Sequence, residues 1–175
     1  TNPRIYAAGD VAGGQASVGA AHEQARIVID NALLAFVPRH HSDVPRVVST
    51  DPEVAEVGFT ERTARTKFGT SFRVMRAAYA ENDRARARRE TYGVAKLIVG
   101  PGGKLLGAGI AGAGAAELCA LFSLALAANL NVAQLSQFAA PYPSLAEIAS
   151  RLGRAMPRAN DPLTRALLTL NRLLG

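Results

Sequence analysis

Residues 44–61 read VPRVVSTDPEVAEVGFTE, and this stretch begins the largest folded unit that the sequence predicts. Within it, VVST at 47–50 and VAEVGF at 54–59 have the β-branched composition of short strands. Thr60 is placed to cap a helix over residues 61–68. Two strands followed by a capped helix indicate a sheet with helices packed on it.

Three further strand patterns follow: FRVMRAAY at 72–79, GVAKLIVG at 93–100 and KLLGAGIAG at 104–112. The sequence Pro-Gly-Gly at 101–103 separates the last two and predicts a hairpin turn. Strands joined by short turns favour antiparallel pairing. We therefore expect an antiparallel sheet.

Helical patterns occupy the remainder of the C-terminal half, at 115–129, 132–139, 144–156 and 161–175. Asn131 is the expected cap of the second of these helices. Together with the strand patterns, these helices predict the α+β class, with helices packed against an antiparallel sheet.

The N-terminal segment has a different organisation. Residues 4–8 (RIYAA) predict a short buried strand, and a glycine-rich loop follows it. Ser17 is the expected cap of one long helix that Pro38 ends. The polar residues 39–45 then form a linker to the next unit. Because a loop at the carboxyl end of a strand is a frequent ligand-binding place, this segment is a candidate site.

Composition limits the possible classes of protein. A chain of 175 residues with 49% hydrophobic residues can bury a sizeable core. No apolar run approaches the ~20 residues that span a bilayer, and Thr1 is not followed by a signal-peptide pattern. We expect a cytoplasmic piece of a longer protein, without a membrane partner. Cys119 lies among apolar neighbours and is predicted to be a core residue.

The formal net charge of +6 comes mainly from arginine. The densest basic cluster consists of Arg84, Arg86, Arg88 and Arg89, which we expect in a solvated or partner-facing loop. No stacking aromatics are interleaved with these arginines, and no nucleic-acid-binding motif is present. We therefore expect no nucleic-acid partner.

The sequence GAGIAG at 107–112 formally matches a dinucleotide-binding loop. Such a loop needs an acidic residue about 20 positions further on, and none lies between Glu117 and Glu147. Close packing of a strand on a helix explains these glycines better. The three histidines have no cysteine or carboxylate partner at metal-ligand spacing, so no metal site is predicted.

Four segments of the chain resemble the pyridine nucleotide-disulfide oxidoreductase family, which includes dihydrolipoamide dehydrogenase and mercuric reductase. The opening stretch 44–61 is similar to the start of the family's dimerisation domain, V-P-x-x-x-F-T-D-P-E-x-A-x-V-G-x-T-E. Asn82-Asp83-Arg84-Ala85, with Gly93–Leu97 and Leu106–Ala108 after it, resembles the family's N-D-R-A, G-x-x-K-L and L-G-A motifs. The helix containing Glu117 leads to the fourth segment, at 142–147.

The remaining segment, Ile5–Asp10, is similar to the family's FAD motif, a strand that ends in A-x-G-D. The resemblance implies that Gly9 and Asp10 contact FAD, with the Asp10 carboxylate accepting bonds from ribityl hydroxyls. It also implies that a backbone N–H near Val18 faces the flavin. Since one strand and one helix are only part of an FAD site, we expect this piece to retain no FAD by itself.

The fourth segment departs from the family pattern. Disulfide reductases of the family have H-P-T-L-S-E there, and their His and Glu form an acid/base pair. Here Tyr142 takes the position of the His, while Glu147 keeps that of the Glu. A phenol with a pKa near ~10 is a poor base at neutral pH, although it can donate a hydrogen bond. Ordinary disulfide reduction is therefore not expected from this pair.

The resemblance implies three parts: a stub of the FAD domain at 1–40, a dimerisation domain at 44–153 and a tail helix at 154–175. It implies a homodimeric parent enzyme that uses FAD and NAD(P)H, of which this fragment alone is not an enzyme. The alternative is a freestanding interaction module that binds an acidic partner through Arg84–Arg89 and the C-terminal helix.

Overall fold

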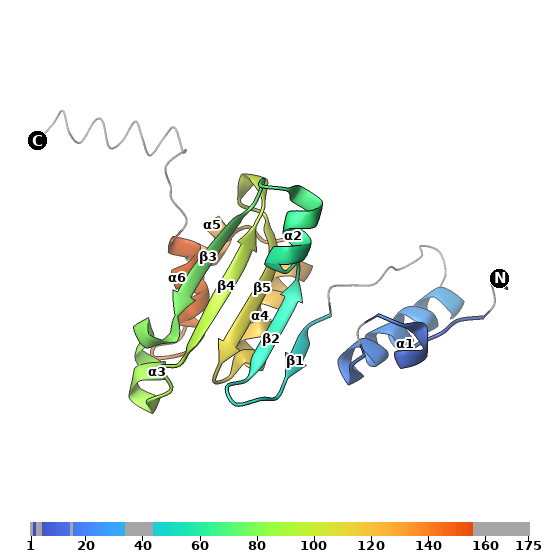
Figure 1. The fold of residues 1–175 in the computed structure, drawn as a ribbon, viewed down its shortest axis with the longest axis horizontal. Helices are drawn as coiled ribbons and strands as arrows, with labels where there is room; N and C mark the ends of the chain where they lie inside the picture. The colour runs from blue at the N-terminus through green and yellow to red at the C-terminus, as the bar shows by residue number, and fades with distance from the viewer. Residues whose placement is uncertain (1, 3–4, 15, 34–43, 156–175) are drawn as a thin grey trace, which may run out of the picture.

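The computed structural model describes residues 2, 5–14, 16–33 and 44–155 (Figure 1). Its centre is an antiparallel 5-stranded sheet with the order β1-β2-β5-β4-β3. The strands are β1 (Arg46–Val48), β2 (Val54–Gly58), β3 (Arg73–Ala78), β4 (Gly93–Val99) and β5 (Leu105–Gly112). The predicted α+β class is confirmed.

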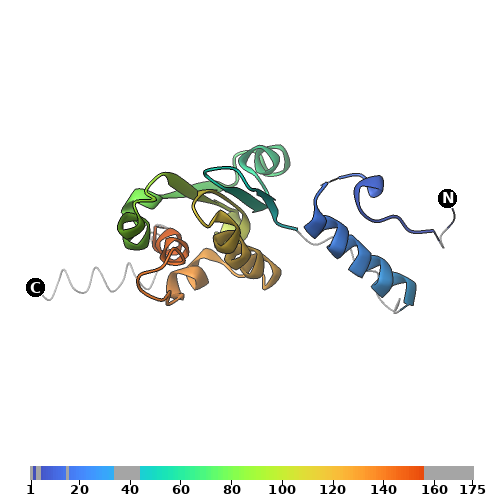
Figure 2. The same cartoon turned by 90° about the horizontal axis from the view of Figure 1, so that it is seen from below.

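Helices cover both faces of the sheet unequally (Figure 2). Helix α2 lies on one face, and α4, α5 and α6 lie on the other. The α-helices are α1 (Val18–Leu33), α2 (Glu61–Phe68), α3 (Asp83–Arg88), α4 (Ala115–Ala127), α5 (Val132–Gln137) and α6 (Glu147–Arg154). The described residues also form the short 3-10 helices η1 (Asp10–Ala12), η2 (Tyr79–Glu81) and η3 (Pro101–Gly103), the last of which is the predicted turn between β4 and β5.

The main core lies between the sheet and helices α4 to α6. Leu97 and Ile110 from the sheet pack with Phe122, Ile148 and Leu152 from the helices, and all five are buried. Cys119 belongs to the same cluster, as predicted, and burial raises the pKa of its thiol to about 11. This core fixes α4 and α6 relative to the sheet.

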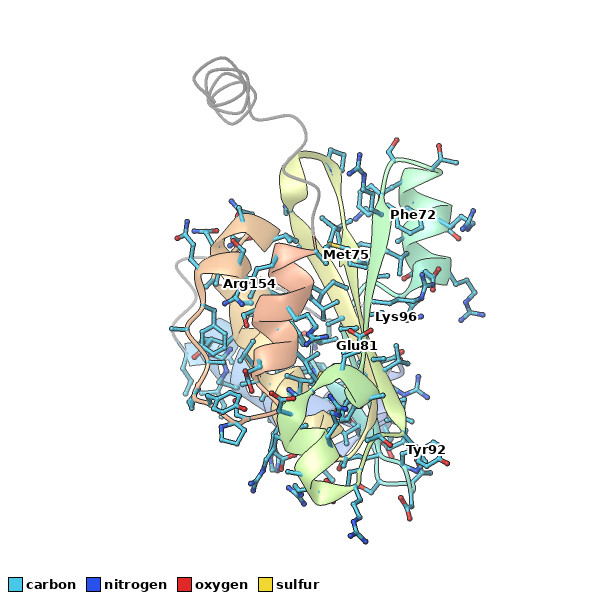
Figure 3. All side chains as sticks on the ribbon, turned by 90° about the vertical axis from the view of Figure 1, so that its left-hand side faces the viewer. Phe72, Met75, Glu81, Tyr92, Lys96 and Arg154 are labelled. Carbon is cyan, nitrogen blue, oxygen red and sulfur yellow. The ribbon has the colours of Figure 1, made fainter. Side chains whose placement is uncertain are left out.

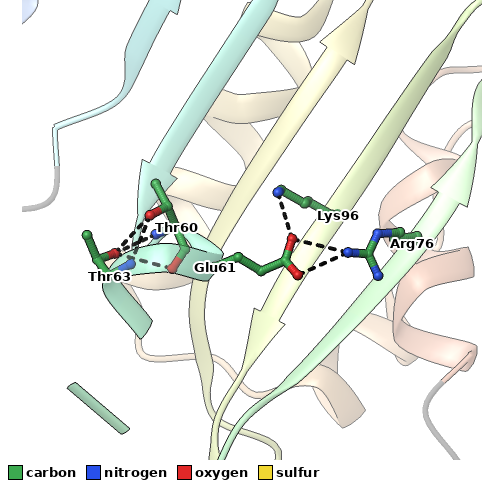
Figure 4. Close-up of polar contacts among 5 residues, drawn as sticks. All are labelled: Thr60, Glu61, Thr63, Arg76 and Lys96. Carbon is green, nitrogen blue, oxygen red and sulfur yellow. Dashed lines mark hydrogen bonds and ion pairs between the residues drawn. The ribbon is translucent and has the colours of Figure 1, made fainter. Parts of the chain in front are cut away.

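Helix α2 is held on the opposite face by a small apolar cluster and by an ion network (Figure 4). The Thr60 side chain accepts a bond from the Thr63 N–H, which confirms the predicted cap. In the first turn, the Glu61 carboxylate lies 3.0 Å from the Lys96 ammonium of β4 and 3.1 Å from the Arg76 guanidinium of β3. The bond from Lys96 is the main cause that lowers the pKa of Glu61.

Two expectations about local structure are wrong. Residues 5–8 form no strand, and Ile5 is 74% exposed, because no neighbouring strand among the described residues offers them backbone partners. The segment Arg84–Arg88 lies in helix α3 and not in a loop. Asn82 caps this helix by accepting a bond from the Ala85 N–H, and Ala85 is buried against the core.

The glycines of GAGIAG lie inside strand β5, so the sequence forms no phosphate loop. A Cβ atom on Gly112 would come within 2.7 Å of the Tyr79 ring, and one on Gly107 would collide with the Phe59 backbone. The expected close packing is present, but the neighbours are a tyrosine ring and an adjacent strand end instead of a helix.

Candidate functional site

Tyr142 lies in the connection between α5 and α6, where its side chain is 73% exposed. Its hydroxyl donates a 3.2 Å hydrogen bond to the Asp83 Oδ2 atom at the start of α3. This bond, together with the charge of Asp83, raises the pKa of Tyr142 above its ordinary value. The phenol is therefore held in its protonated, hydrogen-bond-donating form.

Glu147 is the first residue of α6, and its carboxylate points back along the chain. Its Oε2 atom accepts a 3.1 Å bond from the Ser144 N–H. The charge of Glu147 makes a smaller contribution to the raised pKa of Tyr142, so the two groups are electrostatic neighbours. The structure brings Tyr142 and Glu147 together, while the phenol itself is bonded to Asp83.

Asn82 joins α3 to the segment that contains Tyr142. It is 4% exposed; its Nδ2 group donates a 2.9 Å bond to the Ser144 carbonyl, and its Oδ1 atom accepts from the Ala85 N–H at 3.0 Å. Because Ser144 is also the partner of Glu147, Asn82 fixes the connection on which Tyr142 stands. The sequence offered one signal for this role, an asparagine directly before an acidic first helical turn.

A hollow of about 410 Å³ lies beside this segment. Leu118, Leu121 and Leu145 form its apolar lining, and Arg88 and Glu117 contribute its charged groups. A neighbouring hollow of about 620 Å³ is acidic and is lined by Asp51, Glu53, Glu90 and Glu117, among others.

The outer face of α4 is apolar. Leu124 is 71% exposed, and Ala120 and Leu121 precede it at helical spacing on the same side. Leu121 is partly buried and also packs against the main core, whereas most of the Leu124 side chain is exposed. The leucines of this apolar stripe continue from the lining of the 410 Å³ hollow, in which Leu121 also takes part.

The N-terminal candidate residues form a loop and a helix start. Gly9 has a φ of 79°, a conformation that favours glycine, and its N–H donates a 2.7 Å bond to the Gln24 side chain of α1. Asp10 is exposed in η1. Val18, the first residue of α1, is 73% exposed. A free carboxylate and helix N-terminal N–H groups are donors and acceptors suited to flavin hydroxyl and carbonyl groups.

Comparison with known protein families identifies the family of this domain. The family described as "Pyridine nucleotide-disulphide oxidoreductase, dimerisation domain" matches residues 44–152. The chain belongs to this family. The resemblance inferred from the four sequence segments is thereby confirmed.

Curated relatives include enzymes of two kinds. A mercuric reductase of Streptomyces lividans is 36% identical over 148 residues, which cover 83% of this chain and 31% of the relative. A mitochondrial dihydrolipoyl dehydrogenase of Canis lupus familiaris is 32% identical over 146 residues, covering 83% and 28%. The chain spans about a third of the length of such relatives.

Two solved structures share the fold of this chain. The HOCl-induced flavoprotein disulfide reductase RclA from Escherichia coli, in its Cu(II) complex, matches with a TM-score of 0.78 and 29% identity, over 89% of this chain and 36% of that one. LpdA from Mycobacterium tuberculosis matches with a TM-score of 0.78 and 29% identity, over 86% and 33%.

Within the dimerisation domain, the sequence predicted Tyr142 and Glu147 as site residues but missed Asp83 and Asn82, which hold them. Gly9, Asp10 and Val18 precede this domain in the chain. In the described ranges, no helix is both long and apolar enough to cross a membrane. No group of three or more His, Cys, Asp or Glu residues in the same ranges could hold a metal ion.

Proposed function

We propose that this chain is the dimerisation part of an FAD-dependent, NAD(P)H-linked oxidoreductase that acts as a homodimer. The observation that carries the proposal is the family match over residues 44–152, in a chain that spans about a third of its relatives. The parent enzyme would supply the remaining parts of the FAD site and the NAD(P)H site.

The apolar stripe on α4 supports a homodimer. A two-fold interface uses the same surface on both subunits, so it needs an apolar projection and an apolar hollow within one patch. Leu124 supplies the projection, and the hollow lined by Leu118, Leu121 and Leu145 supplies the depression beside it. Burial of both would remove an exposed apolar surface that has no function in an isolated subunit.

Tyr142 would act as a hydrogen-bond donor, by turning its hydroxyl from Asp83 to the acceptor, and not as a base. Its pKa is raised by Asp83, whereas a base at neutral pH needs a lowered pKa. Asp83 orients the phenol, and Glu147 fixes the start of α6 beneath it. The parent would therefore reduce its acceptor without the His-Glu proton exchange of the disulfide reductases.

The FAD contacts of this chain would come from the N-terminal stub. FAD, when bound, supplies two-electron transfer chemistry. The Asp10 carboxylate would accept hydrogen bonds from flavin hydroxyls, and a backbone N–H near Val18 would stabilise negative charge on the ring. Gly9 would hold the loop to α1 through Gln24. Because these residues form only one side of a site, the isolated chain should not retain FAD.

A freestanding interaction module is the alternative function. Of its two predicted elements, the arginine segment is an ordered helix, and the C-terminal helix at 161–175 lies outside the described residues. Family membership favours the oxidoreductase part over this alternative.

The proposal is tested by light scattering over a dilution series of this chain. We expect a mass of twice the 18.3 kDa of one chain, together with a visible spectrum that lacks flavin absorbance. A monomer at every concentration would remove the support for the homodimer. Flavin that copurifies with the chain would contradict the incomplete FAD site.

A further inference from the structure

The sheet face that carries α2 is covered over only part of its length. Helix α2 packs on Ile98 and Val74, toward one end of the strands. Figure 1 views this face, and beyond α2 no described helix lies over the strands. Figure 3, a view from the β3 edge, shows Phe72 and Lys96 on the α2 side of the sheet and α6 on the other side.

The strand register places five residues in one row across the uncovered part of this face. Val48 pairs with Val54, and Val54 pairs with Ala111. Ala111 pairs in turn with Val94, and Val94 pairs with Ala78 on the other edge strand. We call Val48, Val54, Ala111, Val94 and Ala78 the apolar row. Because neighbouring strands lie about 4.8 Å apart, the row spans about 19 Å.

The apolar row stands where an antiparallel sheet that faces water normally carries polar side chains. Val48, Val54 and Val94 are 45%, 41% and 40% exposed, and the two alanines are half-buried. The next row toward α2 follows the normal pattern, since it is charged apart from one glycine and consists of Arg46, Glu56, Gly109, Lys96 and Arg76. The apolar row is therefore a continuous apolar surface that the described chain leaves uncovered.

Exposed apolar side chains elsewhere in the chain belong to surfaces that the proposed function completes. The N-terminal stub exposes Val11, Val18 and Leu33 by 85%, 73% and 76%, and most of the FAD domain would lie outside this chain. Leu124 belongs to the stripe on α4 that is proposed to form the homodimer. Because α4 packs on the opposite face of the sheet from α2, that homodimer leaves the apolar row free.

We propose that the apolar row is the surface on which the dimerisation domain packs against the part of the parent enzyme that this chain lacks. The inference rests on the proposed function, in which this chain is about a third of such an enzyme. Strand β1 is the first strand of the dimerisation domain, and it carries Val48 at one end of the row. A domain joined to the chain before β1 is therefore held at high effective concentration beside the row.

The charges that border the row define the surface that fits it. Arg46 and Arg76 lie on the two edge strands, on the α2 side of the row, and their side chains are 61% and 55% exposed. The packing domain should therefore be apolar along the centre of its contact surface. Carboxylate or carbonyl oxygens should face the two guanidinium groups. Such a mixture of apolar and polar contacts is typical of interfaces between domains of one chain.

The test compares the rates of cysteine labelling in this chain and in the proposed parent enzyme. Val54→Cys and Val94→Cys place thiols in the row on β2 and β4, the two strands that flank β5. Val47→Cys is the matched control, because Val47 is 40% exposed and successive residues of β1 point to opposite faces. Labelling with iodoacetamide is followed peptide by peptide with mass spectrometry, and the natural Cys119 is buried.

We expect the three introduced thiols to react at similar rates in this chain. In the parent enzyme, the thiols of Val54→Cys and Val94→Cys should react at least about tenfold more slowly, because they become accessible only when the domains separate. The thiol of Val47→Cys should keep its rate.

Unchanged rates at both row positions in the parent enzyme would overturn the proposal. Equal slowing of Val47→Cys would also overturn it, because the parent would then cover the β1 edge and not this face. Slow labelling of the row in this chain that becomes faster on dilution would assign the row to a second copy, with the same result. The flavin spectrum and the mass of the parent are measured on the same samples. Protection of the row in a parent that lacks flavin or is monomeric would contradict the proposed function and still support this packing surface.

Discussion

Replacing Leu124 on the outer face of α4 with Lys should separate the proposed homodimer. Fully burying a leucine contributes about 1.5 to 3 kcal/mol. Since Leu124 is 71% exposed, its burial in an interface would contribute about 1 to 2 kcal/mol per subunit, and about 2 to 4 kcal/mol over the two symmetric copies. This loss raises the dimer Kd by about 30-fold or more, and two like charges facing each other add to it.

The change should leave the fold intact. Leu and Lys have similar helix propensities, and a cation near the end of α4 is favourable. The assay is sedimentation velocity over a range of concentrations, with circular dichroism as the check on folding. Val11→Lys is the matched control, because it places the same charge at an 85% exposed site outside the dimerisation domain. A Leu124→Lys chain that dimerises as tightly as the parent chain would refute the α4 interface.

Three further predictions concern the site and the core. In the proposed parent enzyme, Tyr142→Phe should lower kcat by about 100-fold with an unchanged flavin spectrum, since it removes the donor hydroxyl; unchanged turnover would contradict this role. Asn82→Ala should lower the free energy of unfolding, measured by urea denaturation, by about 1 to 3 kcal/mol, because it leaves the Ser144 carbonyl without its partner. Asn131→Ala, which removes a half-buried helix cap, should lower it by about 1 kcal/mol. Equal losses in the two variants would contradict the role of Asn82 in joining α3 to the Ser144 segment. The contribution of the Cys119 thiol and the Tyr79 phenol to the free energy of unfolding should be constant below about pH 9 and should be lost as the pH rises further, because these groups ionise near 9.0 and 10.0 when unfolded but at about 11 and about 12 when folded. Cys119→Ala should remove the lower part of that loss, and an unaltered pH profile would show that the thiol makes no contribution.

The strands and caps of the dimerisation domain could be predicted because their determinants are local. Thr60 and Asn131 cap the helices that their neighbours predict, and the glycines at 101–103 form the expected turn. Helix α3 was missed because its residues alternate between arginine and alanine, a pattern without helical periodicity. Its stability comes from the Asn82 cap and from the burial of Ala85, which depend on the core.

The strand predicted at the N-terminus is absent because strand formation, like α3, depends on contacts outside the segment. The composition of residues 4–8 is typical of a buried strand, but a strand needs backbone partners that local sequence cannot supply. In the described structure residues 5–8 have no neighbouring strand to pair with, so this composition does not form a strand there.

The sequence alone determined the family, the α+β class and the positions of Tyr142 and Glu147, because motifs, hydrophobic periodicity and turn residues are properties of neighbouring residues. Only the tertiary structure decided that the Tyr142 phenol bonds to Asp83, 59 positions earlier. It also decided that Asn82 reaches Ser144, 62 positions further on, and that α4 keeps an apolar face outward. Contacts over such separations depend on how the core places α3 and α6 against the sheet, and no local pattern encodes them.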